Sequence, residues 1–340
     1  MMRSILANLA LPLAILAAQA VEAAESPDLL PPSIDGRPVE VAIGFYALDF
    51  ARVTSREESF DVTGYLELSW RDPRLALPPG SDLKGGLPRR LDASQAWRPS
   101  YFFENALEQP RFHGEPTVEV DANGQVTSWA MVTGKFSSQM DLRRFPFDRQ
   151  EVFVRIGSTE DVSRVRFVAK PELAIVGEEA FVTDWEIGQA SSGVSLHRYV
   201  PGQDTYSIFF YKVELSRRST FYLWRVMLPL TLLAIVSWAA FWFEPVGLQP
   251  QISTCMAALI ALVAFNFAID FSLPKVSYLT LIDKHALIGF GFVAISVVAV
   301  TLIHRAVVAG KLDRAKAIQR FVRWGFLPAY GICVALNLLY

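Results

Sequence analysis

Residues 252–269, ISTCMAALIALVAFNFAI, form a stretch of eighteen residues without a charged side chain. At 1.5 Å of rise per residue, a helix of this length crosses most of a hydrocarbon core of about 30 Å. Every third or fourth position gives a stripe that begins small or polar and ends bulky and apolar: Ser253, Ala257, Ile260, Ala264, Phe267 and Phe271. A wettable half followed by a constriction that can shed water is what an ion pore requires. The same composition also suits an ordinary buried helix of a membrane bundle, and periodicity alone leaves both interpretations open.

Residues suited to catalysis or metal binding do not gather in the sequence. There is no Gly-rich phosphate loop, no nucleophile elbow and no pair of histidines at ligand spacing. The four histidines are scattered, and each is expected at a surface or an interface: His113, His197, His285 and His304. Cys255 and Cys333, the two cysteines, lie in apolar segments, which argues against a disulfide framework and against a zinc site. We therefore expect no enzyme, no cofactor and no metal site.

The composition places the chain among membrane-associated proteins. It has 340 residues, of which 52% are apolar, and the apolar excess is concentrated in the C-terminal third. This length favours two domains. The net charge of −2 gives no basic excess, so nucleic acid is not an expected partner.

The amino terminus is typical of a secretory signal peptide. Arg3 is followed by an apolar run over residues 5–18 and then by small residues around 20–24. This pattern predicts a signal peptide over residues 1–24, removed near Ala23 or Ala24. The mature chain is then expected to begin outside the cytoplasm.

Residues 25–218 are predicted to form a β-sandwich. Apolar and polar residues alternate over 39–45, 60–70, 125–133 and 151–156, with Pro- and Gly-rich breakers between the alternating runs. Asn123-Gly124 between two such runs is a strong signal for a short hairpin. Many short strands joined by close turns favour two packed sheets of the immunoglobulin-like kind.

Residues 219–340 are predicted to form a transmembrane domain of four helices. The apolar spans are expected at 221–243, 251–270, 282–304 and 320–340. The connection after the third span is basic and has a single acid, Asp313, so it is expected on the cytoplasmic side. Pro229 is expected to kink the first span. Four crossings then leave both ends of the mature chain on the outer, periplasmic side of the membrane.

Residues 140–150, MDLRRFPFDRQ, resemble the signature loop of the pentameric ligand-gated ion channels, the Cys-loop receptor superfamily. Residues 97–99, WRP, resemble that family's first binding-loop segment, and residues 273–278, LPKVSY, resemble its link between the second and third membrane helices. The order of signal peptide, sandwich and four spans is the family's layout. The cysteines that name the superfamily are absent, because their positions hold Ser138 and Val152. This absence and the short link between spans three and four resemble the bacterial branch.

The resemblance implies a homopentamer in a lipid bilayer, with five second spans around one pore. Pore-lining positions would be Gln249, Ser253, Ala257, Ile260, Ala264, Phe267 and Phe271, with Ile260 and Phe267 as the closed barrier. Cation-selective members of the family have a glutamate where Gln249 stands, whereas Glu244 and Asp270 lie at the two ends of the span. Since no Lys or Arg lies between residues 244 and 269, monovalent cations are the expected permeant ions.

The resemblance also implies an agonist site between neighbouring sandwiches, where aromatic rings hold a cation. The matching positions are Tyr46, Tyr65, Tyr101, Phe102, Ser158, Glu160, Tyr199 and Tyr206. An amine held near Glu160 or Glu67 is one expected ligand. The acid that amine-gated bacterial members carry in the first loop is replaced by Phe102, which counts against an amine. The tyrosines could also be ordinary packing residues of the sheet.

Protons are a second expected stimulus. Glu58 and Asp49 match carboxylates that face the membrane domain in the acid-activated bacterial member, and a carboxylate at a moving interface can bias a conformational equilibrium. For coupling, the resemblance pairs Asp148 with Arg217, places Pro274 and Lys275 above the pore, and puts Ser55 where the family has an Asp. The alternative for the pair is an ordinary surface salt bridge of little energetic weight.

The expected function is therefore an agonist-opened cation channel. The alternative is a non-conducting receptor that binds a periplasmic ligand and signals inward. The link of under twenty residues between the last two spans disfavours that alternative, because it leaves little protein inside to contact a partner.

Overall fold

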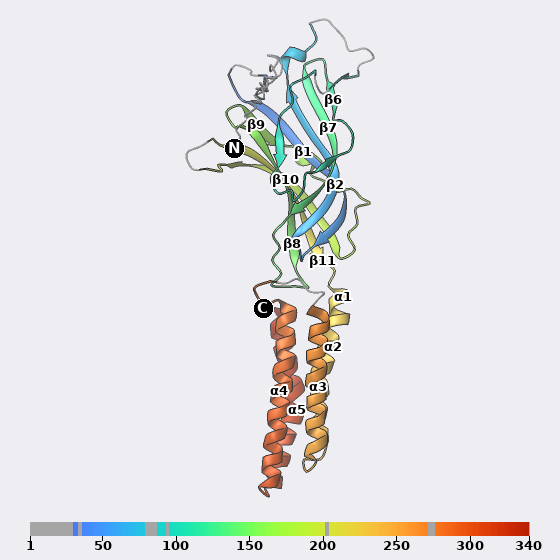
Figure 1. Cartoon of the computed structure of the whole chain (residues 1–340), viewed down its shortest axis with the longest axis vertical. Coiled ribbons are helices and arrows are strands. Elements are labelled where there is room, and N and C mark those ends of the chain that lie inside the picture. The colour runs from blue at the N-terminus through green and yellow to red at the C-terminus, as the bar shows by residue number, and fades with distance from the viewer. Residues whose placement is uncertain are drawn as a thin grey trace, which may run out of the picture.

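The protein consists of an upright β-sandwich above a bundle of long helices (Figure 1). The structure, a computed structural model, describes residues 30–32, 36–78, 87–92, 95–200, 204–270 and 276–339. The predicted signal peptide at 1–24 lies outside these residues. The C-terminal end of the last helix lies at the junction between the helices and the sandwich, as an even number of membrane crossings requires (Figure 1). The predicted fold class, an immunoglobulin-like sandwich followed by four membrane helices, is confirmed.

Two sheets form the sandwich. The first has the strand order β3-β6-β7-β2-β1-β9, with β5 paired to β7, and the second has the order β10-β11-β8-β4. Neighbouring strands run antiparallel, except for the parallel pair β1 and β9. The strands are β1 (Val39–Thr54), β2 (Ser59–Arg71), β3 (Arg89–Leu91), β4 (Tyr101–Phe103), β5 (Arg111–Phe112), β6 (Thr117–Val120), β7 (Gln125–Ser137), β8 (Arg149–Asp161), β9 (Val165–Ala169), β10 (Trp185–His197) and β11 (Tyr206–Arg217).

The hairpin expected at Asn123-Gly124 joins β6 to β7, where Val120 lies opposite Val126. Gly124 has a φ of +77°. A Cβ at this position would also lie 2.4 Å from the carbonyl oxygen of Asp72. Both the dihedral angle and the close approach require a glycine. The hairpin prediction is confirmed.

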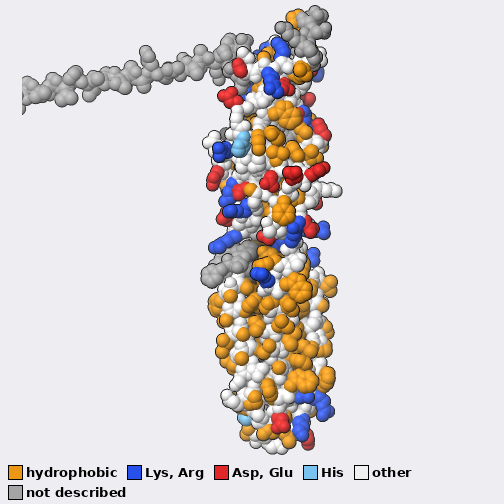
Figure 2. Space-filling view, turned by 90° about the vertical axis from the view of Figure 1, so that its right-hand side faces the viewer, with side chains coloured by type: hydrophobic (Ala, Val, Ile, Leu, Met, Phe, Trp, Pro, Cys, Tyr) orange, Lys and Arg blue, Asp and Glu red, His pale blue; other side chains and the backbone are white. Residues whose placement is uncertain are grey.

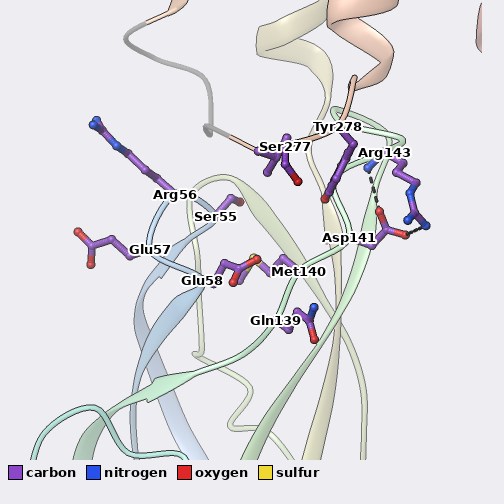
Figure 3. Close-up of a pocket in the computed structure, with 11 residues that line it drawn as sticks. Ser55, Arg56, Glu57, Glu58, Gln139, Met140, Asp141, Arg143, Ser277 and Tyr278 are labelled. Atoms are coloured by element: carbon purple, nitrogen blue, oxygen red, sulfur yellow. Dashed lines mark hydrogen bonds and ion pairs between the residues drawn. The ribbon is translucent and has the colours of Figure 1, made fainter.

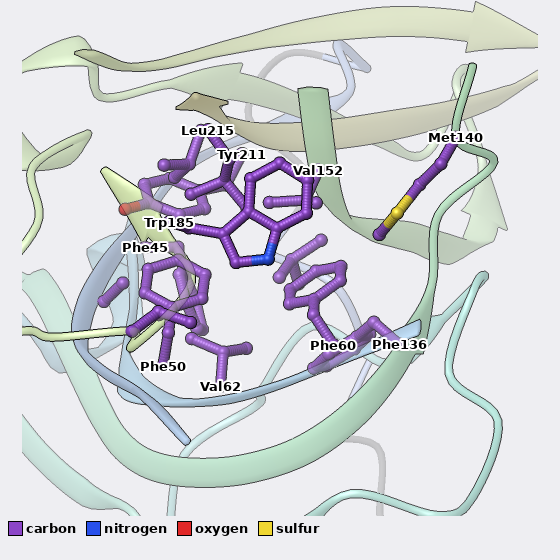
Figure 4. Packing of buried hydrophobic residues seen from close by; sticks show 14 of the residues in the cluster. Phe45, Phe50, Phe60, Val62, Phe136, Met140, Val152, Trp185, Tyr211 and Leu215 are labelled. Atoms are coloured by element: carbon purple, nitrogen blue, oxygen red, sulfur yellow. The ribbon is translucent and has the colours of Figure 1, made fainter. Parts of the chain in front are cut away.

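Aromatic rings fill the space between the sheets (Figure 4). Phe45 and Phe60 come from the first sheet, Trp185 and Tyr211 from the second, and all four are at most 2% exposed. Their side chains alternate with outward-facing residues because successive residues of a strand point to opposite faces. Each buried ring stabilises the sandwich by roughly 1.5–3 kcal/mol.

Among the described residues, four helices are long and apolar enough to cross a membrane: Thr220–Trp242, Leu248–Ile269, Leu281–Val308 and Leu312–Leu339. The second is α3 (Leu248–Asp270), the third α4 and the fourth α5. α5 begins at Leu312, well before the start at residue 320 that hydropathy predicts. Gly310, with a φ of +71°, ends α4, and the basic segment that follows continues in helical conformation. A hydropathy window misses such a charged helical turn.

The first membrane helix, Thr220–Trp242, changes its hydrogen-bond pattern in front of Pro229. It consists of α1 (Thr220–Tyr222), a π-helical turn (Leu223–Met227), α2 (Leu228–Trp238) and a 3₁₀ turn (Ala239–Trp242). Proline has no N–H to donate, and its ring disturbs the preceding turn, so the chain widens there. The irregularity lies where Pro229 predicts one.

The surface agrees with a membrane location. Figure 2 shows hydrophobic side chains over the whole helical half, whereas charged side chains cover the sandwich and gather again at the far end of the helices. Arg305, Lys311 and Arg314 lie at that far end, which the positive-inside rule assigns to the cytoplasm. The chain is a multipass membrane protein.

Candidate functional site

The predicted pore stripe lies along one exposed face of α3. Ile260 and Phe267 are 64% and 68% exposed, whereas Cys255 and Leu262 on the opposite side are fully buried. The exposed stripe comprises Gln249, Ser253, Ala257, Ile260, Ala264 and Phe267. Its last predicted member, Phe271, lies outside the described residues. α3 packs through its buried side against α2 and α4, and the stripe faces outward in the part of the chain that the structure describes.

Three of the predicted agonist residues form a ring cluster on the outer face of the second sheet. The ring centres of Phe102 and Tyr199 are 6.4 Å apart, and those of Tyr199 and Tyr206 are 5.8 Å apart. The Tyr199 hydroxyl donates to Oε1 of Glu104 at 3.3 Å. Burial, followed by the nearby Glu104 carboxylate, raises the pKa of Tyr199 to about 12. This phenol therefore stays a hydrogen-bond donor at physiological pH.

Tyr101, Ser158 and Glu160 lie beside this cluster without joining it. Tyr101 packs edge-on against Phe103, and burial raises the pKa of its phenol. The Ser158 hydroxyl is buried and donates to the carbonyl oxygen of Glu160. The Glu160 carboxylate lies 3.5 Å from Arg164. The structure thus gives these residues structural contacts, while their role toward an agonist stays a prediction.

The two remaining agonist candidates lie on the first sheet. Tyr46 and Tyr65 face each other across β1 and β2 and line a hollow of about 500 Å³ together with Trp129 on β7. Glu67, one of the acids expected near an amine, is buried and paired with Lys170. Tyr46 and Tyr65 therefore lie on a different sheet from Phe102 and Tyr206, and one agonist site shared by the two groups stays a prediction.

The predicted coupling residues Asp148 and Arg217 form a buried ion pair. Nε of Arg217 lies 2.7 Å from Oδ1 of Asp148, and Nη2 lies 3.0 Å from Oδ2. The Arg217 side chain is 4% exposed and the Asp148 side chain 2%. The guanidinium lies between the rings of Trp185 and Phe145, 4.0 and 4.7 Å from their centres. This bidentate, enclosed pair is not the exposed surface bridge that the sequence left open.

Two neighbouring polar side chains form hydrogen bonds with the ion pair. Nη2 of Arg217 donates to the Ser55 hydroxyl at 2.6 Å, and Nε2 of Gln150 donates to Oδ2 of Asp148 at 2.7 Å. Ser55 belongs to the turn between β1 and β2, so the network joins that turn to β8 and β11. A serine can therefore accept from Arg217 at the position where the family has a carboxylate.

A hollow of about 640 Å³ lies between the sandwich and the helices (Figure 3). Glu58, one of the predicted proton-sensing residues, points into it beside Met140, whereas Arg56 points away. Glu58 has a φ of +48°, and its carbonyl oxygen accepts from the backbone of Ser138 at 2.8 Å. Pro274 and Lys275, the other predicted coupling residues, lie outside the described residues.

Tyr278 provides a direct contact between the membrane domain and the signature loop. Its hydroxyl accepts from the backbone N–H of Leu142 at 2.9 Å, and the guanidinium of Arg143 lies 5.4 Å from its ring centre. Tyr278 belongs to the linker motif LPKVSY, for which no contact partner was predicted. Glu104 and Trp129 were not identified from the sequence either. Glu104 lies two residues after Phe102, and Trp129 alternates with buried residues of β7. This alternation was the signal that could have indicated them.

No group of three or more His, Cys, Asp or Glu side chains that could hold a metal ion occurs in the part of the chain that the structure describes. The candidate functional regions are three: a cluster of aromatic rings, a buried ion pair and an exposed face of α3. This arrangement is suited to binding and to conformational change.

Comparison with known proteins identifies the architecture. Residues 26–218 match the family model of the neurotransmitter-gated ion-channel ligand binding domain. A proton-gated ion channel of Gloeobacter violaceus is 28% identical over 299 residues, which cover 87% of this chain and 81% of that protein. The human glycine receptor subunit beta is 27% identical over 311 residues, or 85% of this chain and 58% of its own length. The human gamma-aminobutyric acid receptor subunit rho-1 is 24% identical over 273 residues, or 78% and 56%.

The chain thus spans little more than half of the two receptor subunits and most of the Gloeobacter channel. The family match alone covers more than half of this chain, from the start of the predicted sandwich to the residue that follows Arg217. With four apolar helices following the matched region, the chain belongs to the family of neurotransmitter-gated ion channels.

Proposed function

We propose that the chain forms a homopentameric, cation-selective channel whose pore is lined by α3. Family membership supports the pentamer. The observation that carries the pore assignment is the division of α3 into a buried side and an exposed stripe. Five copies placed around an axis would surround a path that is small and polar near Ser253 and narrows at Ile260 and Phe267, where bulky apolar rings exclude water.

The charge distribution at the cytoplasmic end of α3 supports cations. Glu244 and Gln249 are exposed there, and the chain has no Lys or Arg between Glu244 and Ile269. A ring of five carboxylates at the mouth concentrates cations and repels anions. We place the protein in a bacterial inner membrane with its sandwich in the periplasm, which agrees with the basic cytoplasmic end of the helices.

The proposed stimulus is an extracellular small molecule, a change of pH, or both. The Phe102, Tyr199 and Tyr206 cluster supports the first, since aromatic rings with a nearby carboxylate suit a cationic group. For the second, the Gloeobacter relative is named a proton-gated channel, and Glu58 lies in the hollow between sandwich and helices. The buried Asp148–Arg217 pair and the Tyr278 contact would carry movement of the sandwich to the pore.

Current recordings from liposomes or oocytes test the pore. Ile260→Thr puts a hydroxyl at the proposed barrier and should produce a resting cation current, because a polar ring no longer sheds water. Ile332→Thr on α5 is the matched control, since Ile332 is comparably exposed, and it should leave the resting current unchanged.

An unchanged resting current in Ile260→Thr would reject the barrier assignment. Ligands and pH from acidic to alkaline are scanned on the same preparations, with ion substitution to read the selectivity. A pentamer that binds a ligand yet never conducts would favour the alternative, a receptor that signals inward.

A further inference from the structure

The cations at the cytoplasmic end of the helices have no carboxylate partner in the part of the chain that the structure describes. Every ion pair among the described residues lies at or before Arg218, in the sandwich. Residues 243–250 and 304–324 nevertheless hold six Lys and Arg side chains against two acids, Glu244 and Asp313. The six are Arg305, Lys311, Arg314, Lys316, Arg320 and Arg323. An anion from outside the subunit can therefore pair with them.

Two exposed indole rings lie next to these cations, where the first membrane helix meets α5. Trp242, the last residue of the first helix, is 53% exposed, and Trp324 of α5 is 68% exposed. Their ring centres are 6.4 Å apart, with one ring edge-on to the other. Large amphipathic rings are favoured at the depth where lipid headgroups meet acyl chains. The pair therefore marks the level of the cytoplasmic headgroups.

The contacts around the two rings are fixed by hydrogen bonds between the helices. Nε1 of Trp238 donates to the carbonyl oxygen of Arg323 at 2.7 Å, and the ring centres of Trp238 and Trp242 are 5.4 Å apart. The Arg323 guanidinium lies 4.7 Å from the centre of the Trp242 ring and donates two hydrogen bonds to the carbonyl oxygen of Phe241. A surface held in this way loses little conformational entropy when it binds a partner.

Two unpaired cations continue this surface toward the cytoplasm. Lys316 and Arg320 are exposed and four residues apart, so they lie on the same side of α5 on successive turns, and Trp324 follows after four more residues. Each step of four residues advances about 6 Å along the helix. The order from the cytoplasm inward is thus ammonium, guanidinium and indole. A phospholipid presents its phosphate, its glycerol esters and its acyl chains in the same order.

We propose that Lys316, Arg320, Trp324 and Trp242 bind the headgroup of an anionic phospholipid of the cytoplasmic leaflet, of the phosphatidylglycerol type. The two cations hold the phosphodiester, and the two indoles cover the glycerol esters and the first methylene groups. A zwitterionic lipid is disfavoured, because its ammonium group lies beyond the phosphate and meets repulsion from the same cations. A soluble phosphate is disfavoured as well, since it has no chain to pack against the rings.

Tryptophan quenching by brominated lipids tests this assignment on the full-length pentamer. The protein is placed in phosphatidylcholine nanodiscs that contain the same small fraction of either dibrominated phosphatidylglycerol or dibrominated phosphatidylcholine. The brominated phosphatidylglycerol should quench more strongly, and Trp324→Phe should reduce this difference, because it removes a fluorophore at the site. Arg320→Gln and Lys316→Gln should each lower the preference for phosphatidylglycerol by about fivefold.

Arg314→Gln is the matched control, since Arg314 is an exposed cation of the same helix. It lies six residues before Arg320, which turns it about a third of a turn away around the helix axis. The variant removes the same charge at a distance where salt screens it, so the preference should change by less than about twofold.

Three results would each overturn the proposal. The first is equal quenching of the wild type by the two brominated lipids. The second is an equal loss of preference in Arg314→Gln and Arg320→Gln, which would show a diffuse attraction and no site. The third is removal of the preference by excess glycerol 3-phosphate, which would show that the headgroup binds without its chains. Because the measurement needs no current, a channel that never conducts can still show the lipid site, and a conducting channel can lack it.

Discussion

An arginine network lies near each end of the first membrane helix, Thr220–Trp242, and the two arginines use different partners. Just before the outer end, Arg217, the last residue of β11, pairs with the Asp148 carboxylate within the sandwich. At the inner end, Arg323 of α5 donates through Nε and Nη2 to the carbonyl oxygen of Phe241, at 2.9 and 2.7 Å. Nε2 of Gln319 donates to the same carbonyl at 2.9 Å and to that of Phe243 at 2.6 Å.

The outer pair lies within the sandwich, just before the helix begins, whereas the inner contacts join two helices of the membrane domain. The outer pair is an attraction between two full charges, which persists when their distance and orientation change. The inner contacts are directional hydrogen bonds that satisfy the free carbonyls of a helix end, and they weaken steeply when the geometry changes. We infer that the outer network fixes the strand that leads into this helix, whereas the inner contacts fix the helix itself to α5.

The most severe test of this comparison is Arg217→Met. It leaves the Asp148 carboxylate buried without its cation, so we expect a loss of about 3 to 5 kcal/mol of stability and loss of the stimulated current. Thermal unfolding of the detergent-solubilised pentamer and current recordings measure the two effects. Arg218→Gln is the control. Arg218 is exposed, and its distance of 4.0 Å from Glu186 is long for an ion pair, so the change should alter stability by at most about 0.5 kcal/mol. A stable, fully gated Arg217→Met channel would contradict the assigned role of the pair.

Arg323→Met should have a smaller effect. It removes two donors from the Phe241 carbonyl, but Gln319 still donates to that oxygen, so we expect a loss of about 1 to 3 kcal/mol in thermal unfolding. The sensitivity to the stimulus should remain close to that of the wild type, because an anchor does not take part in the movement. Arg314→Gln, at an exposed position on the same helix, is the control. A large change in stimulus sensitivity with unchanged stability would reverse the comparison.

Tyr278→Phe tests whether the response to the stimulus depends on the Asp148–Arg217 ion pair alone. The change removes only the hydroxyl that accepts from the Leu142 N–H, which should cost about 1 kcal/mol and shift the half-activating stimulus by several-fold. Ser277→Ala, in the same hollow, should produce no such shift. Concentration–response recordings on the three channels give the answer. If both variants gate like the wild type, Arg217 would be the sole polar contact that matters there.

Local patterns in the sequence were sufficient for much of the architecture. Alternation predicted the strands, Asn123-Gly124 predicted a hairpin, and the uncharged runs predicted four helices. The Asp148–Arg217 contact came from the family resemblance, because the two residues are far apart in the chain. Neither source showed that the pair is enclosed by Trp185 and Phe145, since burial depends on how the sheets pack.

The features missed from the sequence are non-local contacts of ordinary residues. Glu104 lies next to Arg155 only because β4 pairs with β8, and no spacing in the sequence indicates that neighbour. Tyr278 meets Leu142 across the two domains. Likewise, no pattern in the sequence indicated that Gln319 and Arg323 cap the end of another helix, as they do in the structure.

The capping box at the start of α4 has a mechanical consequence for gating. The Thr280 hydroxyl accepts from the N–H of Asp283 at 3.3 Å, and the Asp283 carboxylate accepts from the N–H of Thr280 at 2.8 Å. Such a reciprocal lock resists fraying of the first turn. A displacement of Tyr278 by the sandwich would therefore tilt or translate α4 as one rigid unit. The movement would be transmitted along the helix, because its first turn does not unwind.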